Sequence, residues 1–230
     1  MQRPPDTQQQ RIGYTARGNS MQFDVEGHLG AVERSVSSLE REGQPARAVT
    51  MSRSFATTVD DLWDAVTSSE RIPRWFVPVS GELELGGRYQ LEGNAGGVIT
   101  ACEPPSHFAL TWEFAGVSWV EVHVADGGDG SARLTLSHIA HLSDYWDQYG
   151  PGAAGVGWEM GLLGLALHIA RPDAPKPDEA AFAASPDGKA FITGSSEGWE
   201  QAAVAAGTDP EAAHAAATRT TAFYTGGPTP

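Results

Sequence analysis

The sequence predicts an α+β protein in which an antiparallel meander of strands is closed by one long apolar helix and followed by a helical extension. Three observations predict this class. Residues 79–141 form strand-like segments separated by Gly, Asn and Pro turn signals. Residues 151–170 follow a helical period with almost no polar face. After Arg171 the composition changes to a Pro-rich linker and Ala-rich helical segments.

Composition sets the broad class of the protein. The chain has 230 residues, 40% of them hydrophobic, which is enough for one large domain or for one domain with appendages. A net charge of −14 argues against nucleic acid and anionic membranes as partners. The single cysteine, Cys102, excludes an intramolecular disulfide and fits a cytoplasmic location. Its strand-like surroundings favour a buried bystander over a nucleophile.

Three regions are expected along the chain. Residues 1–22 are rich in Gln, Pro and Arg without periodicity, so we expect a disordered tail, and they contain no apolar segment of a secretory signal. Residues 23–171 are expected to form the main domain. Residues 172–230 are expected to form a helical extension packed on it.

The first part of the domain is ambiguous. Apolar residues in Leu29–Arg41 fit a helical stripe, and part of the same segment fits a strand leading into a turn at Glu42–Pro45. We prefer a β-hairpin, because Arg47–Phe55 that follows alternates clearly between apolar and polar residues. Thr58 then caps a helix, with Asp61 in the position of a capping box. Ser68–Phe76 is a second, shorter helical piece interrupted at Pro73.

The meander consists of six expected strands. Gly86–Gly87, Asn94–Gly97, Pro104–Pro105 and Asp126–Gly130 mark turns or breaks between them. The expected strands are Val79–Leu85, Arg88–Glu92, Val98–Glu103, His107–Phe114, Ser118–Val124 and Ala132–His141.

The helix predicted over residues 151–170 has two opposed apolar stripes, and only the slice around Glu159 and Ala166 is left for water. Its apolar run is too short to cross about 30 Å of hydrocarbon, so we expect a buried helix and no membrane span. A third stripe contains Gly157, Gly161 and Gly164. Each mid-helix glycine costs roughly 1 kcal/mol relative to alanine, so we expect a sheet, a helix or a ligand to approach closely there.

The extension begins after the linker PDAPKPD. Ser185–Pro186 opens a helix with proline at its first position. A capping box at 208–211 opens an alanine-rich helix that stops at Gly226–Gly227. We expect these helices to cover the outer stripe of residues 151–170.

The order of these elements, with one strand, two short helices, a meander and a long helix, is that of the helix-grip fold. The residues resemble the START-like (SRPBCC) superfamily, and within it the branch named for the activator of Hsp90 ATPase. The resemblance covers roughly residues 46–170 and rests on these pieces: Arg53–Phe55, 59–67, Glu70–Ile72, Trp75–Phe76, 85–89, 103–105, 110–112, 134–136 and Gly157–Trp158.

The resemblance implies a sheet that curls around the last helix and leaves a cavity between them. Members of this superfamily include binders of hydrophobic ligands, cyclases or aromatases of polyketides, and proteins that bind chaperones. Most bacterial members of the branch have no assigned reaction. The extension after residue 171 lies outside the pattern of the branch.

Three motifs fail their tests of structural context, and we therefore expect no cofactor and no metal. Gly150-x-Gly152-x-x-Gly155 matches a dinucleotide fingerprint but follows antiparallel strands rather than a βαβ unit. Gly194-x-Ser196-x-Gly198 matches a nucleophile elbow without the required parallel sheet, which favours a helix-surface serine and no hydrolase activity. His138 and His141 point to opposite faces of one strand and cannot share a metal there.

Strand parity predicts the lining of a cavity. Leu134, Leu136 and His138 share one face, and the other concave positions are Tyr89, Leu91 and residues 108, 110, 112 and 114. His138 is either a core histidine with a backbone partner or a polar anchor in an apolar pocket. Glu159 is either paired, at the cavity mouth, or raised in pKa by burial. The candidate ligand-binding residues are Trp75, Phe76, Tyr89, Trp112, Phe114, His138, Trp158, Glu159 and Met160, although the pair Trp75–Phe76 also fits core packing.

Three functions are compatible with this sequence. The first is a binder of a hydrophobic small molecule or lipid, the second a protein-interaction module, and the third a cyclase-like enzyme that uses His138 or Glu159 as general base. A cavity of several hundred Å³ is expected for the first or third. A filled core with an exposed apolar patch is expected for the second.

Overall fold

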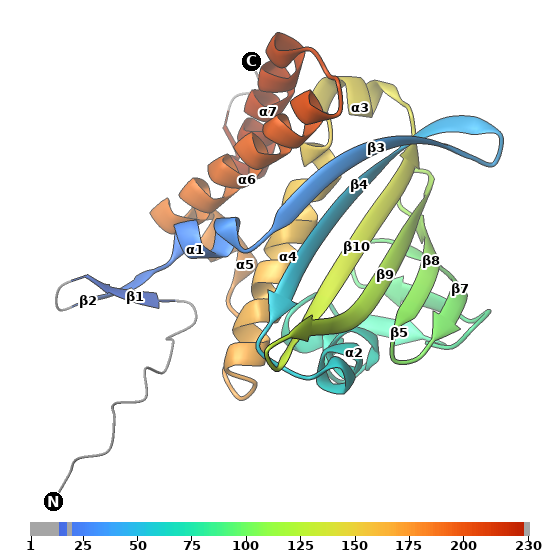
Figure 1. Ribbon diagram of the computed structural model, residues 1–230, viewed down its shortest axis with the longest axis vertical. Coiled ribbons are helices and arrows are strands. Elements are labelled where there is room, and N and C mark those ends of the chain that lie inside the picture. The colour runs from blue at the N-terminus through green and yellow to red at the C-terminus, as the bar shows by residue number, and fades with distance from the viewer. Residues whose placement is uncertain (1–13, 18–19, 228–230) are drawn as a thin grey trace, which may run out of the picture.

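An eight-stranded antiparallel sheet forms the main layer of the computed structural model, which describes residues 14–17 and 20–227, with side chains described from Phe23 onward (Figure 1). The strand order is β3-β4-β10-β9-β8-β7-β6-β5. The sheet is curved, and α2 and α4 lie on its concave side (Figure 1). The strands are β3 (Glu33–Arg41), β4 (Gln44–Phe55), β5 (Val79–Gly81), β6 (Arg88–Leu91), β7 (Gly96–Glu103), β8 (His107–Glu113), β9 (Val117–Gly128) and β10 (Ser131–His141).

The predicted helix-grip architecture is confirmed, and the differences lie at strand ends. β5 covers three residues instead of the expected seven, because the chain turns at Gly81 with φ 105°. β9 continues to Gly128, so the turn into β10 is tighter than Asp126–Gly130 suggests. A short helix that the sequence does not predict, α3 (Asp144–Tyr149), follows β10 and is capped by Ser143.

The hairpin preferred for the ambiguous N-terminal segment is confirmed as β3 and β4. Val36 pairs with Val49, and the connecting residues Glu42 and Gly43 both have positive φ, 52° and 77°. Positive φ at both central residues is the geometry of a tight hairpin turn that matches the twist of its strands. The competing helical pattern over Leu29–Arg41 does not form. A short helix, α1 (Val25–Gly30), ends near the start of that segment.

The disordered tail expected over residues 1–22 is wrong in part. β1 (Tyr14–Arg17) and β2 (Ser20–Phe23) pair as an antiparallel ribbon. Strands of four residues are too short to leave a readable alternation in the sequence. The remainder of that expectation, residues 1–13 and 18–19, lies outside the described residues.

The first of the two helical pieces predicted after β4 forms as predicted. The second is a 3₁₀ turn of three residues that contains Pro73, and not a helical piece over Ser68–Phe76 interrupted there. α2 (Val59–Thr67) is capped by Thr58, whose hydroxyl accepts from the Asp61 amide at 3.2 Å. The Asp61 carboxylate does not complete a capping box. It instead accepts from the Thr57 hydroxyl at 2.6 Å and from Arg71 at 2.7 Å, which fastens α2 to the following 3₁₀ turn, η1 (Ile72–Arg74).

The long apolar helix is α4 (Gly152–Ala170), and it lies between two layers of protein. Val156, Leu162 and Leu165 pack into the core formed with the concave face of the sheet. α6 covers the other side (Figure 1). By length and composition α4 is the one helix among the described residues that matches a membrane span, with mean hydropathy 1.3. A central core helix meets the same criteria.

The glycines of α4 are contact points for other elements, as their cost predicts. A Cβ at Gly164 would lie 2.5 Å from the Trp75 carbonyl oxygen, and one at Gly161 would lie 3.5 Å from the Phe76 ring. A Cβ at Gly155 would lie 2.3 Å from the indole of Trp199. The segment after η1 therefore approaches α4 at Gly161 and Gly164, and the extension approaches it at Gly155.

The extension contains α5 (Glu179–Ala184), α6 (Pro186–Ala205) and α7 (Pro210–Thr225). Ser185 caps α6 with proline at the first position, as predicted. The cap of α7 is Asp209 and not Thr208, because the carboxylate adjoining Pro210 reaches the Ala212 amide at 3.1 Å. α7 ends at Gly226 in the left-handed conformation, φ 67°.

α6 buries large apolar side chains against the domain. Phe191, Ile192 and Trp199 are each at most 1% exposed, and the last two belong to the main core cluster. The expectation that Glu159 and Ala166 face water is wrong, since they are 1% and 5% exposed. The side of α4 that carries Glu159 is covered by β3 and α6.

Candidate functional site

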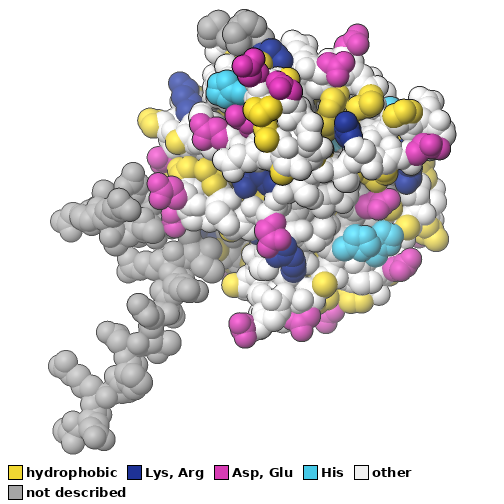
Figure 2. All heavy atoms as spheres, turned by 45° about the horizontal axis from the view of Figure 1, so that its top comes forward, with side chains coloured by type: hydrophobic (Ala, Val, Ile, Leu, Met, Phe, Trp, Pro, Cys, Tyr) yellow, Lys and Arg dark blue, Asp and Glu magenta, His cyan; other side chains and the backbone are white. Residues whose placement is uncertain are grey.

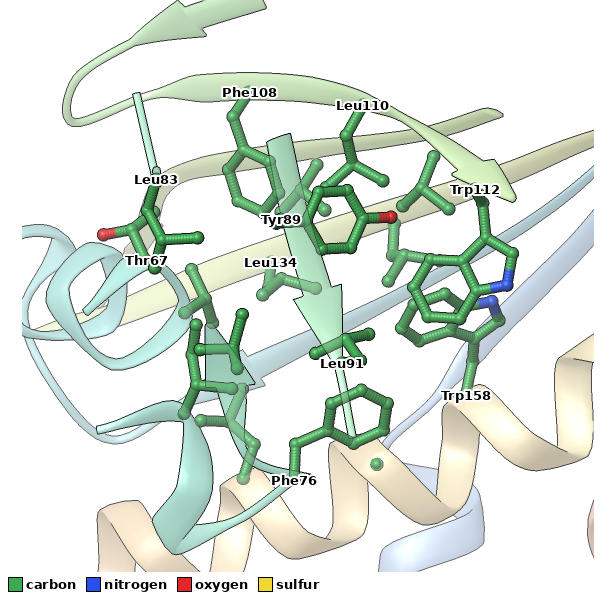
Figure 3. Close-up of a pocket in the computed structure, with 18 of the residues that line it drawn as sticks. Thr67, Phe76, Leu83, Tyr89, Leu91, Phe108, Leu110, Trp112, Leu134 and Trp158 are labelled. Atoms are coloured by element: carbon green, nitrogen blue, oxygen red, sulfur yellow. The ribbon is translucent and has the colours of Figure 1, made fainter. Parts of the chain in front are cut away.

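An apolar cavity of about 140 Å³ lies between the sheet, α2, the segment after η1 and α4 (Figure 3). Its floor is the concave face of the sheet, with Val120, Val122, Leu134 and Leu136. β6, with Tyr89 and Leu91, lies across the cavity in the view of Figure 3. Leu134 and Leu136 of this floor lie on the concave face that strand parity predicts.

Four aromatic rings form one wall of the cavity. The rings of Trp75 and Phe76 stack with centroids 5.4 Å apart, and Phe76 stacks on Trp158 at 6.0 Å. Trp112 lies 4.8 Å from Trp158 in a tilted arrangement. All four line the cavity, and so does Tyr89. Five of the nine candidate residues are therefore brought together at one cavity.

His138 does not line this cavity. Its Nδ1 accepts a hydrogen bond from Trp158 Nε1 at 2.8 Å, which assigns the ring proton to Nε2. Nε2 therefore donates to Ser118 Oγ at 2.9 Å, and Ser118 Oγ donates to the Trp112 carbonyl at 3.1 Å. Burial lowers the pKa of His138 to about 4, so the neutral form persists. His138 is a core histidine that fixes the orientation of Trp158.

Two further candidates are wrong as cavity residues. Phe114 is 62% exposed, because β8 ends at Glu113 and the strand alternation stops there. Met160 is half-buried and does not line the cavity. Trp158 and Leu162 take the cavity side of α4, and Met160 is about 200° around the helix from Trp158.

Glu159 is also absent from the cavity, because it forms a buried ion pair with Arg34. Its two oxygens accept from Arg34 Nε and Nη2, both at 2.6 Å. Arg34 also donates to the carbonyls of Val32 and Leu29. Burial raises the pKa of Glu159, and the Arg34 guanidinium offsets part of this rise. The pair fastens β3 to α4 and leaves no free carboxylate to act as a base in the cavity.

A second buried histidine lies beside an arginine. The Arg53 guanidinium and His28 Nδ1 are 3.0 Å apart, and both side chains are at most 6% exposed. Burial, followed by the charge of Arg53, lowers the pKa of His28 to about 4. Burial also lowers the pKa of Arg53 to about 10. The stacked ring of Phe23 covers His28 at 5.0 Å.

These two histidines predict a loss of stability in mild acid. Between pH 6.5 and about 4 the unfolded chain binds their protons and the folded chain does not, so the free energy of unfolding decreases as pH falls. At 1.36 kcal/mol per pKa unit, each contributes roughly 3 kcal/mol by the bottom of this window. Urea denaturation at pH 7.0, 5.5 and 4.5 measures the effect.

A histidine substitution tests this assignment. His138→Gln is expected to flatten the slope of unfolding free energy against pH in this window, because it removes one of the two groups that bind a proton only in the unfolded chain. Equal slopes in the wild type and in the variant would contradict the assignment.

The sequence motifs without structural context serve packing. Ser196 lies in α6, 1% exposed, and its hydroxyl donates to the Ile192 carbonyl, so it is a buried helix serine and not a surface one. Gly152 and Gly155 lie against α7 and α6. His141 packs on Trp119 at 5.1 Å on the convex face, opposite His138. Among the described residues no three His, Cys, Asp or Glu side chains form a group that could hold a metal ion.

The outer surface shows no concentration of positive charge on the face drawn in Figure 2. Asp and Glu side chains are spread over that face, with single Lys and Arg side chains between them. This distribution agrees with the net charge of −14 and the unfavourable interaction with polyanions that it implies. Hydrophobic side chains appear there in small separate groups.

The curved sheet, the central helix and the cavity between them define a helix-grip protein of the START-like class. Residues 56–168 match the family described as "Activator of Hsp90 ATPase homolog 1-like protein". The domain that these residues form belongs to that family.

Named relatives fall into two groups. The mouse (Mus musculus) protein "Activator of 90 kDa heat shock protein ATPase homolog 1" is 30% identical over 83 residues, 35% of this chain and 24% of the mouse protein. The chain thus spans about a quarter of that relative. The crystal structure of CalU16 from Micromonospora echinospora is 29% identical, with TM-score 0.61, and the likeness covers 77% of this chain and 99% of CalU16. The solution structure of CalU16 is also 29% identical, with TM-score 0.64, and the likeness covers 76% of this chain and 97% of CalU16.

Several cavity residues were not among the nine candidates. Val66, Leu83 and Ile99 line the cavity from α2, from the loop after β5 and from β7. Single aliphatic residues carry no signal of a site, because the same pattern predicts a filled core. Cys102, expected to be a buried bystander, is half-buried and also lines the cavity.

Proposed function

We propose that this protein binds compact apolar molecules, with one or two rings, in the cavity between the sheet and α4. The observation that carries the proposal is the cavity volume of about 140 Å³ with a lining of aliphatic and aromatic side chains. Cavities of about 150 Å³ lined by such side chains stay dry and admit benzene. Apolar pockets with few polar groups are the usual form of small-molecule sites.

The volume narrows the ligand class expected from the sequence. Drug-sized ligands occupy pockets of roughly 300 to 1,000 Å³. The cavity of about 140 Å³ is smaller than the several hundred Å³ expected, so long acyl chains and polycyclic molecules exceed it. The wall of four aromatic rings favours a flat ring, which can stack on or meet them edge to face.

The alternative functions have less support. A cyclase-like reaction was expected to use His138 or Glu159 as base, and both are engaged outside the cavity. A chaperone partner is suggested by the name of the mouse relative, of which this chain spans about a quarter. An unfilled apolar cavity favours a small molecule, since a protein-interaction module has no need of one.

A pair of tryptophan substitutions tests the proposal. Ile99 lines the cavity from β7, and its neighbour Thr100 is exposed on the other face. Ile99→Trp places an indole in the cavity, and we expect it to weaken binding of indene, a two-ring hydrocarbon, at least tenfold in isothermal titration calorimetry. Thr100→Trp adds the same ring outside and should leave the affinity within twofold of the wild type. Absence of indene binding to the wild type, or equal effects of the two substitutions on the affinity for indene, would overturn the proposal.

A further inference from the structure

The hydroxyl oxygen of Tyr89 lies at the cavity beside the aromatic wall. Its ring lies over the cavity and its hydroxyl points toward Trp112 (Figure 3). The hydroxyl donates to the Thr111 carbonyl at 2.8 Å. Burial raises the pKa of Tyr89, so the hydroxyl keeps its proton and its donor stays in this bond. The remaining lone pairs of the oxygen can only accept.

Two glycines leave room for the side chain of Tyr89 in this position. Its cross-strand partners on both sides are glycines, Gly81 on β5 and Gly97 on β7. A Cβ at Gly97 would lie 2.0 Å from the Thr111 carbonyl oxygen, the same atom that accepts from Tyr89. The absence of a side chain at Gly97 therefore lets β8 and the Tyr89 hydroxyl meet.

The other polar groups of the described lining have their strong donors occupied or turned away. Thr67 donates to the Trp63 carbonyl at 2.7 Å, and in Figure 3 its oxygen points away from the ring of Tyr89. Trp75 donates to the Ala65 carbonyl, and Trp158 donates to His138. The nitrogen of Trp112 lies on the edge of its ring that is turned away from Tyr89 and Leu134 (Figure 3). The thiol of Cys102 is a weak donor.

We propose that Tyr89 is a specificity-determining residue that accepts a hydrogen bond from the ligand. The site then prefers compact aromatic molecules that carry an O–H or N–H group over molecules of equal size that carry only acceptors. This inference rests on the proposed function. A ligand carbonyl or ether oxygen loses its water on entry and finds no strong donor among the described lining, whereas a hydroxyl or ring N–H finds the Tyr89 oxygen.

Three bicyclic probes of one shape test this inference. Indene has no polar atom, indole carries an N–H donor, and benzofuran carries only an acceptor. The quantity to compare is the ratio of the benzofuran Kd to the indole Kd, measured by calorimetry for the wild type and for Tyr89→Phe. Comparing one ratio between two proteins cancels the different hydration of the probes. A net hydrogen bond of about 0.5 to 1.5 kcal/mol corresponds to a fall of this ratio by roughly twofold to tenfold in the variant.

The indene affinity separates this inference from the proposed function. Indene carries no hydrogen-bonding group, so its binding to the wild type tests the cavity site without the Tyr89 acceptor. Normal indene binding with an unchanged benzofuran to indole ratio would overturn the role of Tyr89 and leave the cavity site intact. Failure of all three probes to bind the wild type would overturn both.

A measurement on the wild type covers the case in which Tyr89→Phe does not fold. ¹⁵N-labelled indole bound to the full chain is expected to show its N–H proton shifted downfield, with nuclear Overhauser contacts to the Tyr89 ring. Bound indole whose N–H shows no contact to Tyr89 would contradict the inference.

Discussion

Removal of residues 172–230 is expected to leave a chain that aggregates or exposes a large apolar surface. Phe191, Ile192 and Trp199 of α6 are almost fully buried, and two of them join the core cluster that contains α4. Each large apolar side chain that loses its cover costs about 1.5–3 kcal/mol, and the loss on the α4 side is similar. The total approaches the whole stability of a typical domain. Size-exclusion chromatography and binding of a hydrophobic dye measure the outcome.

A short truncation is the control for this experiment. Removal of residues 228–230, which follow the end of α7, should leave the elution volume and the melting temperature unchanged. If the chain ending at Arg171 were a monomer with the melting temperature of the full protein, α6 would not be part of the core.

Arg34→Met is expected to lower the free energy of unfolding by about 3–5 kcal/mol. The substitution leaves the Glu159 carboxylate buried at 1% exposure without the two charged hydrogen bonds of 2.6 Å. An unpaired buried charge must be neutralised or hydrated, which is the source of the cost. Chemical denaturation in urea gives the value. We expect part of the loss to return in the double variant Arg34→Met with Glu159→Leu, because the unpaired carboxylate is then removed. The recovery is incomplete, since Glu159 also stabilises the charge of the buried Arg53 guanidinium.

The matched control is a more exposed Arg–Glu pair that joins β3 to β10, with its glutamate next to Arg34 in the sequence. Glu33 of β3 contacts Arg133 at 2.6 Å, and its side chain is 77% exposed. Arg133→Met should cost less than about 1 kcal/mol, because water screens this pair. Similar losses for Arg34→Met and Arg133→Met would show that burial of the Glu159 pair has no special energetic role.

The periodic parts of the fold could be predicted from the sequence. Alternation over β4 and β6–β10 and the apolar stripes of α4 report which face each residue takes, because those faces are buried in the structure. The short elements could not be predicted. β1, β2 and α3 have four to six residues each, so their patterns are too brief to separate from loops. Caps were readable where a side chain directly precedes the helix, as at Thr58 and Ser185.

The candidate site was predicted where parity decides and missed where long-range packing decides. Tyr89 and Trp112 line the cavity because each lies on the concave side of its strand. The prediction that Phe114 lines the cavity was wrong, because β8 ends one residue before it. The prediction that Glu159 belongs to the cavity was wrong. Its partner, Arg34, is 125 residues away in the sequence, and no local pattern connects the two. His138 took the predicted face, but Trp158 stands between it and the cavity.

The central claim is that the apolar cavity of about 140 Å³ receives a compact ring. The most direct measurement is a crystal structure of the full chain grown with indene. We predict electron density for one indene molecule between the wall of Trp112 and Trp158 and the floor at Leu134, with the fold unchanged. A structure in which the Phe76 or Tyr89 ring occupies this volume, and in which no indene is present, would contradict the account.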